Sequence, residues 1–436
     1  MKQAVPPGPR SNITKKYFAN RVRFFDEVRR DYGPLIYFRI GFVRVYLVTD
    51  PADVRTVMTD RGMRKSWITK LLLWPVVGNG LLLSEGELYK RQRRLIQPAF
   101  HRQRVEVYGR VAVESALEWS QAKTHGQPVE MGDEMMGLTL DIVGRSLFGS
   151  EMGEQARQVA RSLDAFYGLV DRVVALGPLA FFLPTPRNFR FLWCLFRLNR
   201  FVDQMIRQRE REVPRDDFLS MLVHAEEDGH KMSSSQVRSE ALTLLLAGHE
   251  TTAVAMTWIW YLLSQNPDCE RRLHRELDEV LEGRPPTVED MDRLDYTRRV
   301  VTESMRLYPP AYLVDRQPSQ DFELHGYRIP RGSYVFVSPY LTQREAEFFP
   351  DPTRFDPDRW LPEVAAQRPQ HSYFPFGVGP RACIGQSFAW MESILVLATL
   401  AQTWRAELDP DQVVDTDAKI TLRPRYGMKM TLRRRQ

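Results

Sequence analysis

The chain has 436 residues, of which 43% are hydrophobic and 27% charged, the usual composition of a globular protein with a core large enough to enclose a cofactor. Its net charge of +6 comes from basic residues spread along the chain. No basic run is interleaved with aromatic residues, which argues against nucleic acid as a partner. Three cysteines are too few for a disulfide framework, and the first ten residues have no apolar core of a signal peptide or anchor. We expect one domain, residues 1–436, in the reducing cytoplasm.

Three segments have the β-branched and alternating patterns of strands. They are 35–49, which predicts a hairpin in a β-rich part over about 30–60, then 325–338, and the tail 419–435, which predicts a closing strand pair. The pattern over about 86–310 is mainly helical, and another apolar helix follows Cys383. The sequence therefore predicts a mainly α fold with small segregated β-sheets.

One predicted helix is unusually long. Ser233, Ser234 and Ser235 are N-cap candidates, and an apolar run over about 236–265 ends at Asn266-Pro267. A membrane span would have this length, but the polar cluster His249-Glu250-Thr251-Thr252 lies at its centre, where charge in a bilayer is costly. We expect a helix buried inside a globular protein, with a function for its polar centre.

The strongest motif is Phe376-Gly-Val-Gly-Pro-Arg-Ala-Cys-Ile-Gly385. Its glycines allow a tight turn and close approach to a flat ligand, and Arg381 can reach an acidic group on that ligand. Cys383 precedes a helix whose free N–H groups favour a thiolate, the form that ligates haem iron. An inert cysteine in a glycine-rich turn, or a zinc site with His371, explains the ten-residue pattern less well.

The centre of the long helix, Ala247-Gly-His-Glu-Thr251, also has a chemical interpretation. Gly248 leaves room beside the helix, and a threonine hydroxyl can divert a backbone carbonyl and open a groove. Glu250 and Thr251 supply an acid and an alcohol for proton delivery. The alternative is a kinked core helix with incidental polar groups. We expect His249 to be a packed helix residue and not a metal ligand.

Residues 376–385 resemble the haem-binding loop of the cytochrome P450 family, F-G-x-G-x-R-x-C-x-G, at every fixed position. Further family landmarks follow in the expected order over almost the whole chain. The resemblance implies a soluble, bacterial-type member with the cytochrome P450 fold. Haem b then lies between the 236–265 helix and this loop, with Cys383 as axial ligand. Phe376, Gly377, Arg381 and Ala247 are then cofactor-binding residues, and Thr251 and Glu250 match the oxygen-activation motif.

Two more family landmarks are present with substitutions. Glu303 and Arg306 match the family's E-x-x-R pair, whose partner is Arg359, and a structural role is implied. Arg93 matches a residue that contacts a haem propionate, whereas Tyr89 stands where the family usually has Trp. Arg316 is a further propionate candidate. Asp358, Trp360 and Gln343 also depart from the common residues, which puts local packing in doubt.

The implied activity is a monooxygenase that inserts one oxygen atom from O2 into an apolar organic substrate, such as a fatty acid, terpenoid, steroid or xenobiotic. A glycine-rich nucleotide fingerprint and a flavin domain are both missing, so electrons from NAD(P)H must come through another protein. We expect an acidic ferredoxin, flavodoxin-type protein or reductase, docked on a basic segment of a monomer. The segment contains Lys90, Arg91, Arg94, Arg102 and Arg104.

Two alternatives remain open for the function. One is a haem-thiolate isomerase or peroxygenase, and the other is a haem-based sensor that binds a ligand without turnover. The apolar stretch 176–186 falls where the family has its substrate entrance. It is a mobile lid, a membrane-dipping patch, or a loop packed over the core, and it is the one place where we expect any membrane contact.

Overall fold

The computed structural model describes residues 5–11, 13–149, 183–213, 215, 217–227 and 230–435. The chain forms two compact units, each made of segments that are far apart in sequence. The first unit contains Met1–Thr69, Arg299–Cys383 and Val413–Tyr426, and the second contains Lys70–Arg298, Ile384–Gln412 and Gly427–Gln436. The expected single domain over 1–436 stays a prediction.

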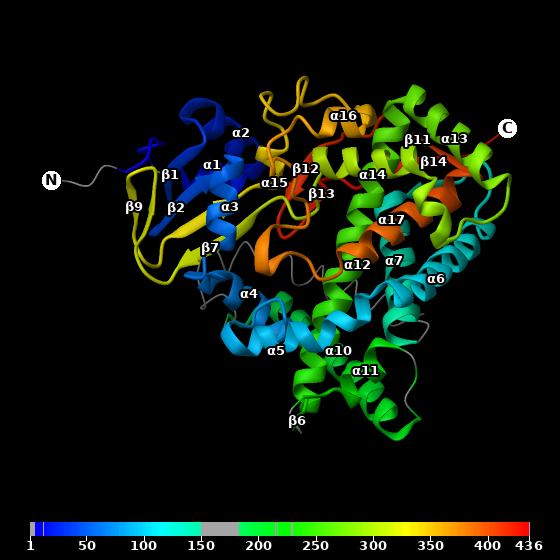
Figure 1. Cartoon of the computed structure of the whole chain (residues 1–436), viewed down its shortest axis with the longest axis horizontal. Helices are drawn as coiled ribbons and strands as arrows, with labels where there is room; N and C mark the ends of the chain where they lie inside the picture. The colour runs from blue at the N-terminus through cyan, green and yellow to red at the C-terminus, as the bar shows by residue number, and fades with distance from the viewer. Residues whose placement is uncertain are drawn as a thin grey trace. The chain divides into compact units, whose positions relative to one another are not determined.

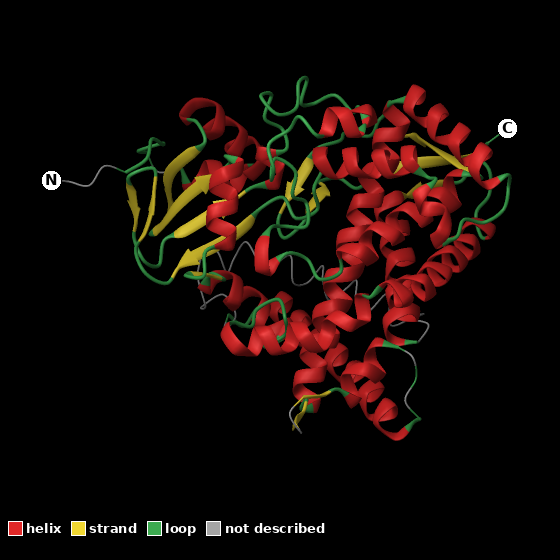
Figure 2. Cartoon of the chain, viewed as in Figure 1, coloured by secondary structure: helices red, strands yellow, loops and turns green. Residues whose placement is uncertain are grey.

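The first unit holds most of the strands, drawn in yellow in Figure 2. Its strands are β1 Leu35–Ile40, β2 Val43–Val48, β3 Met63–Arg64, β7 Val314–Pro318, β8 Phe322–Leu324, β9 Tyr327–Ile329, β10 Tyr334–Val337, β12 Thr416–Ala418 and β13 Leu422–Pro424. Its helices are α1 Thr14–Ala19, α2 Arg21–Tyr32, α3 Pro51–Thr59, α15 Pro339–Thr342 and α16 Pro362–Ala365, with short 3₁₀ turns η3 Pro357–Trp360 and η4 Gly379–Arg381. Two more helices, α4 Trp67–Val77 and α14 Asp295–Leu307, contain points where the chain passes between units.

A five-stranded sheet in the order β1-β2-β10-β7-β3 organises the first unit. Side chains alternate between its faces. One face buries Ile36, Phe38, Val45 and Leu47 against aromatic residues of α1 and α2. The other face buries Leu35, Tyr46 and Val48 against α3, together with Phe374, just before the predicted haem loop, and Val378 within it. The alternation of side chains along β1 and β2 thus decides which face of the sheet packs against the loop.

The hairpin predicted over 35–49 is confirmed by the antiparallel pairing of β1 with β2, with Gly41 at φ 56° in the turn. The β-rich region is shorter than the predicted 30–60, because Pro51–Thr59 is helix α3. Asp50 caps this helix, accepting hydrogen bonds from the backbone N–H groups of Ala52 (2.9 Å) and Asp53 (3.2 Å). An N-cap aspartate followed by proline is a helix start, and here it overrode the strand pattern.

The second unit is mainly helical, as Figures 1 and 2 show. Its helices are α5 Gly86–Ile96, α6 Arg102–Gln121, α7 Met131–Phe148, α10 Pro186–Arg211, α11 Phe218–His224, α12 Ser234–Gln265, α13 Pro267–Leu281 and α17 Gln386–Ala401, with 3₁₀ turns η1 Gln97–Phe100 and η2 Val288–Asp292. Its strands are β4 Pro128–Glu130, β5 Glu226–Glu227, β6 His230–Lys231, β11 Trp404–Leu408 and β14 Lys429–Arg434. The predicted fold class, mainly α with small separate sheets, is confirmed.

The long helix α12 is the centre of this unit, and it packs against α7, α10, α11 and α17. It begins as predicted at the serine run, where the Ser233 hydroxyl accepts a hydrogen bond from the Gln236 N–H at 3.2 Å. A Cβ on Gly248 would lie 3.3 Å from Val143 of α7, so glycine here permits close packing of the two helices. Among the described residues, no helix is long and apolar enough to cross a membrane.

The closing strand pair predicted in the tail is wrong in its pairing. Strands form at Leu422–Pro424 and Lys429–Arg434, but β13 pairs with β12, and β14 pairs with β11 and β4. Alternation identifies a strand without identifying its partner, which is set by tertiary contacts. Residues 176–182 of the apolar stretch 176–186 lie outside the described residues. The rest of the stretch is described, and its last residue, Pro186, begins α10.

Candidate functional site

The loop that carries Cys383 is built from tight backbone turns. Gly377 and Gly379 both have left-handed backbones, with φ of 75° and 74°. The Cys383 N–H donates a hydrogen bond to the Phe376 carbonyl at 2.9 Å, and the Ala382 N–H donates to Gly379 at 3.0 Å. These bonds close the loop on itself and leave Cys383 exposed, three residues before α17 begins.

Helix α3 fixes the position of this loop within the first unit. A Cβ on Gly379 would lie 2.9 Å from Thr59 Cγ2 and 3.1 Å from the Met58 carbonyl oxygen. Any other residue would therefore push the loop away from the end of α3, in addition to straining its backbone. The second glycine of the motif is thus required by packing as well as by its turn.

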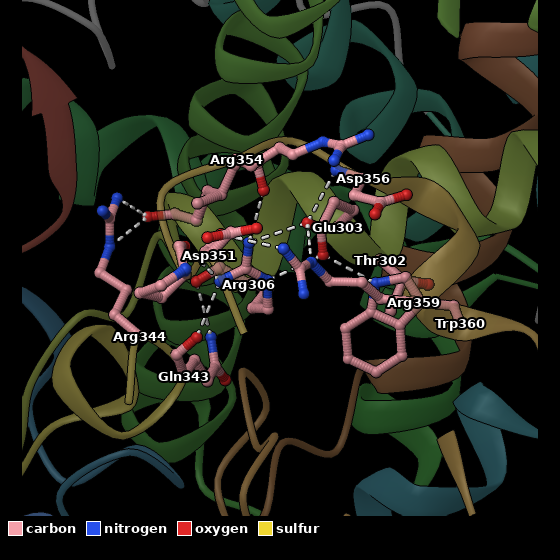
Figure 3. Close-up of polar contacts among 12 residues, drawn as sticks. Thr302, Glu303, Arg306, Gln343, Arg344, Asp351, Arg354, Asp356, Arg359 and Trp360 are labelled. Atoms are coloured by element: carbon pink, nitrogen blue, oxygen red, sulfur yellow. Dashed lines mark hydrogen bonds and ion pairs between the residues drawn. The ribbon is translucent and has the colours of Figure 1, made fainter. Parts of the chain in front are cut away.

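A buried ion network lies in the same unit (Figure 3). Glu303 and Arg306, one turn apart on α14, are both fully buried and form a two-pronged pair with both contacts at 2.8 Å. Arg359 Nε lies 3.4 Å from Glu303 Oε1. The structure therefore brings together the three residues that the sequence singles out.

Every N–H of the Arg306 guanidinium has an acceptor. Apart from Glu303, it donates to the carbonyls of Gln343 (3.0 Å), Pro352 (2.7 Å) and Arg354 (3.1 Å). The buried cation is thus completely hydrogen-bonded, as a buried charge must be to remain ionised. Arg306 ties three stretches of irregular chain to α14.

Two substitutions relative to the family pattern add contacts to this network. Trp360 Nε1 donates to Glu303 Oε2 at 2.9 Å, a bond that phenylalanine cannot make. Gln343 is fully buried and donates to the Met305 carbonyl at 3.0 Å, while its own oxygen accepts from the Phe374 N–H at 3.0 Å. Gln343 thereby connects the end of α14 to the segment that enters the Cys383 loop. The sequence shows these two positions only as departures from the residues that are common in the family, without their contacts.

Arg316 also belongs to the first unit. It lies on β7, its side chain is 3% exposed, and its guanidinium donates to the Asp315 carbonyl at 2.9 Å. Arg381 follows Gly379 in the short turn η4 and is half-buried. Both arginines share their unit with Cys383, whereas Arg93 belongs to the second unit, and their role as propionate partners stays a prediction.

In the second unit, the centre of α12 has an unusual set of hydrogen bonds. The Thr251 hydroxyl donates to the Ala247 carbonyl at 2.8 Å, and Thr252 donates to Gly248 at 3.2 Å. Thr139, from α7, donates to the His249 carbonyl at 2.9 Å. Side-chain hydroxyls therefore engage three successive carbonyls within one helical turn. The helix stays unbroken through this turn, so the groove expected near Thr251 stays a prediction.

Burial divides the residues of this turn into two groups. His249 and Glu250 are buried, whereas Ala247 is exposed and Thr251 is half-buried. His249 Nδ1 lies 2.6 Å from the Leu245 carbonyl, which agrees with a packed helix residue. The helix is buried along most of its length, and Ala247 is an exposed residue near its centre.

Tyr89 and Arg93 lie one turn apart on α5. Arg93 Nη1 donates a hydrogen bond to the Tyr89 hydroxyl at 2.9 Å. Tyr89 is 9% exposed and Arg93 is half-buried. Tyrosine at this position therefore orients the arginine through its hydroxyl, a contact not expected from the sequence.

Glu392, on α17, is a buried carboxyl group that sequence reasoning missed. Burial raises its pKa to about 8, and the Thr252 hydroxyl of α12 offsets only part of this effect. The signal was present in the sequence, because Glu392 is the one charged residue of the apolar helix Gln386–Ala401.

The donor set fits a haem iron better than a free metal ion. Within the described part of the chain, no group of three or more His, Cys, Asp or Glu side chains is placed to hold a metal. A single exposed thiol at the end of a glycine-rich turn suits an iron whose other ligands come from a porphyrin. Cys383 belongs to the first unit, and Thr251 to the second.

Comparisons with known proteins give the same result. Residues 9–431 match the cytochrome P450 family. The chain is 40% identical to cyclooctatin synthase of Streptomyces melanosporofaciens, over 92% of this chain and 87% of that protein. It is 36% identical to pentalenene oxygenase of Streptomyces avermitilis, over 90% and 88%. The haem domain of cytochrome P450DA superposes with a TM-score of 0.89 at 25% identity, covering 100% of this chain and 98% of that one. The chain belongs to the cytochrome P450 family and is a haem-thiolate monooxygenase.

Proposed function

We propose that this enzyme uses Cys383 to hold haem b and inserts one oxygen atom from O2 into a cyclic terpenoid. The geometry of the loop supports Cys383 as the haem ligand, because its thiol is exposed at the end of a turn that only glycine permits. The thiolate donates electron density to the iron, which is the chemistry that favours O–O cleavage. Family membership supports the assignment, because residues 376–385 contain every fixed position of the family's loop.

The substrate class rests on the relatives. The names of cyclooctatin synthase and pentalenene oxygenase indicate cyclic, apolar carbon skeletons, and both proteins match about nine-tenths of this chain. Of the substrates left open by the sequence, terpenoids fit these names, whereas fatty acids, steroids and xenobiotics do not. An oxygenase for such molecules needs few polar contacts to its substrate and a site that excludes water.

Thr251 and Glu250 are the proposed proton-delivery residues. The Thr251 hydroxyl is half-buried and held by the Ala247 carbonyl at 2.8 Å, so its position is fixed by the helix. Glu250, next to it, is buried. A hydroxyl at an exposed helical turn can pass a proton from ordered water, and a nearby carboxyl can resupply it. The isomerase, peroxygenase and sensor alternatives have no need of this pair.

Arginines are the proposed partners of the haem propionates. Arg93, oriented by Tyr89, and Arg316 and Arg381 each offer a guanidinium that suits a carboxylate. Phe376, Gly377 and Ala247 are the proposed contacts to the flat face of the group. For Glu303, Arg306 and Arg359 the proposed role is structural, to stabilise the region around the loop.

Electrons from NAD(P)H arrive, in this proposal, through an acidic ferredoxin, flavodoxin-type protein or reductase. Basic residues of α5 support this docking face. Lys90 and Arg94 are exposed, and Arg91 is half-buried. We further propose that the chain acts in the cytoplasm, because its three cysteines are too few for a disulfide framework, and that it acts as a monomer.

Two measurements test the proposal separately. The reduced, carbon-monoxide-bound protein should absorb at the red-shifted position that thiolate ligation gives, and Cys383→His should lose that band. Unchanged absorption in the variant would remove Cys383 as the ligand. Pentalenene, added to the oxidised enzyme, should shift the haem band by displacing water, whereas dodecanoic acid should not. The opposite preference would retain the monooxygenase and overturn the terpenoid assignment.

A further inference from the structure

The segment between α4 and α5, residues 78–85, is held against α12 by a buried carboxyl group, and we call it the α4–α5 loop. Glu240 of α12 is fully buried, and its Oε2 accepts a hydrogen bond from the Leu81 N–H of the loop at 2.8 Å. Its Oε1 accepts from the Gln236 side-chain amide at 2.7 Å. Glu240 therefore bridges the loop and the helix.

Two glycines allow the α4–α5 loop to lie directly on α12. A Cβ on Gly80 would clash with Thr243 Oγ1 and lie 2.7 Å from the Ser239 carbonyl oxygen, and one on Gly78 would lie 2.5 Å from Ser239 Oγ. Larger residues at these positions would push the loop off the helix. The loop is thus closely packed at the point where the Leu81 N–H meets the carboxyl group.

The α4–α5 loop covers one end of the helix face that carries the proposed proton-delivery residue. Glu240, Thr243, Ala247 and Thr251 are three or four residues apart, so they lie on one face of α12. The loop packs on the first two of them, and Ala247 lies one turn beyond Thr243. A loop that leaves this position would uncover the side of α12 that leads to Thr251.

The Glu240 carboxyl group is buried without a charged partner. Burial raises its pKa to about 7, and the hydrogen bonds from Leu81 and Gln236 offset only part of this effect. Among the described residues, no charged group acts on this pKa. The carboxylate that forms near neutral pH is therefore stabilised by two neutral donors alone, whereas water could stabilise it if the loop moved away.

Charged groups on the elements near Glu240 have partners of their own. The pairs are Arg238 with Asp203 of α10 (2.9 Å), Arg209 of α10 with Asp217 (3.0 Å), Arg145 with Asp141 on α7 (2.9 Å), Lys70 of α4 with Glu85 (3.8 Å) and Lys90 with Glu87 on α5 (2.7 Å).

We propose that Glu240 is a proton-controlled latch, which keeps the α4–α5 loop docked on α12 when protonated and releases it when ionised. In the protonated form the carbonyl oxygen still accepts from Leu81, and the hydroxyl can donate to the Gln236 amide oxygen once that amide rotates. The closed state binds the proton more tightly than an open, hydrated state with the usual pKa near 4.5. Opening therefore becomes more frequent as the pH rises from about 4.5, and levels off above about pH 7.

Hydrogen–deuterium exchange of the full-length, haem-loaded protein at pH 5.5 and 8 tests the latch, in peptides that cover residues 78–85. Glu240→Gln keeps the shape of the protonated side chain and cannot ionise. Comparing both proteins at the same pH removes the pH dependence of the exchange chemistry itself. Relative to the variant, loop opening in the wild type should increase at least about tenfold between the two pH values. Should Glu240→Gln fold poorly, Glu240→Met, which also cannot ionise, replaces it.

Glu392→Gln is the matched control, because it removes another buried carboxyl group, one that lies beside Thr252 and does not contact the loop. Its loop exchange should follow the wild type. Equal pH dependence in the wild type and Glu240→Gln would overturn the latch. Equal effects of Glu240→Gln and Glu392→Gln would also overturn it, since the loop amides would then report global unfolding.

A second measurement asks whether the latch controls access to the iron, a consequence that rests on the proposed function. In stopped-flow mixing, 4-phenylimidazole should bind the oxidised haem faster in the wild type than in Glu240→Gln at pH 8, and at more similar rates at pH 5.5. Equal rates at both values would overturn the control of access. If 4-phenylimidazole does not bind the iron at all, the proposed haem site fails, whereas the exchange experiment still decides the latch.

Discussion

At the scale of single residues, Glu392 makes the most distinctive contribution. Burial raises its pKa to about 8, far above its usual 4.5. The unfolded chain therefore releases this proton at lower pH than the folded protein does. Between about pH 4.5 and 8 the group lowers stability as pH rises, by up to about 1.4 kcal/mol per pH unit.

Replacing Glu392 with glutamine should remove this dependence. We expect Glu392→Gln to exceed the wild type in free energy of unfolding at pH 8, and the difference to shrink toward pH 5. Urea unfolding at pH 5, 6.5 and 8 measures this. Glu279→Gln, at an exposed position of α13, is the control and should follow the wild type. Parallel pH profiles for wild type and Glu392→Gln would show that the carboxyl group does not titrate in this range.

The pair of Glu303 and Arg306 leads to a second prediction at this scale. Glu303→Ala leaves the buried Arg306 cation without its counter-charge, which should cost about 3–5 kcal/mol and give protein with little haem. Asp358→Ala is a matched control, because Asp358 pairs with Arg299 at 2.7 Å but is 38% exposed. Exposed pairs contribute at most about 1 kcal/mol. Equal losses of haem content in the two variants would contradict a special role for the buried pair.

At the scale of elements, the central turn of α12 combines a structural and a chemical function. Its carbonyls at 247, 248 and 249 each accept a hydroxyl, so the helix carries local hydrogen bonds besides its regular ones. Thr252 and Thr139 are buried and act on packing, whereas Thr251 is half-buried beside the exposed Ala247. Of these three threonines, Thr251 is the one that is not buried, which agrees with its proposed role in proton delivery.

Thr251→Ala should separate electron use from product formation. The variant should still bind haem and consume NADPH, but we expect most electrons to appear as hydrogen peroxide, because the proton supply is lost. A general acid of this kind typically contributes about 10²–10⁴-fold. Thr252→Ala is the control, since its hydroxyl is buried against Gly248. The ratio of product to NADPH oxidised measures the effect, and a tightly coupled Thr251→Ala enzyme would exclude this residue from proton delivery.

At the scale of the whole molecule, the net charge of +6 favours an acidic electron donor. Arg91→Glu/Arg94→Glu should slow reduction by a ferredoxin at low salt and flatten its salt dependence. Arg207→Glu/Arg211→Glu changes the net charge equally, on the second half of α10, and should have little effect. Stopped-flow reduction at two ionic strengths distinguishes the two. Equal slowing in both variants would indicate a general charge effect without a docking face on α5.

The sequence was sufficient wherever a local pattern carries the information. The serine cap and apolar run of 233–265 predict α12, and the ten-residue motif predicts the turn at Cys383. The sequence was insufficient where contacts between distant segments determine the structure. The partners of β13 and β14, the bridge made by Gln343, and the Trp360 bond to Glu303 depend on segments that meet only in the folded chain. The helix Pro51–Thr59 was not predicted, although its N-cap residue Asp50 and the proline after it are visible in the sequence.

The complete hydrogen bonding of Arg306 has a consequence for the order of events on the ribosome. Its acceptors Gln343, Pro352 and Arg354, and the partners Arg359 and Trp360, are all made after it. At about 5–20 residues per second, a stretch of about 50 residues takes several seconds to synthesise. During that time the nascent chain holds a charged pair that cannot yet be buried. Cys383 emerges later still, so the support for the haem loop can be complete before its ligand leaves the ribosome.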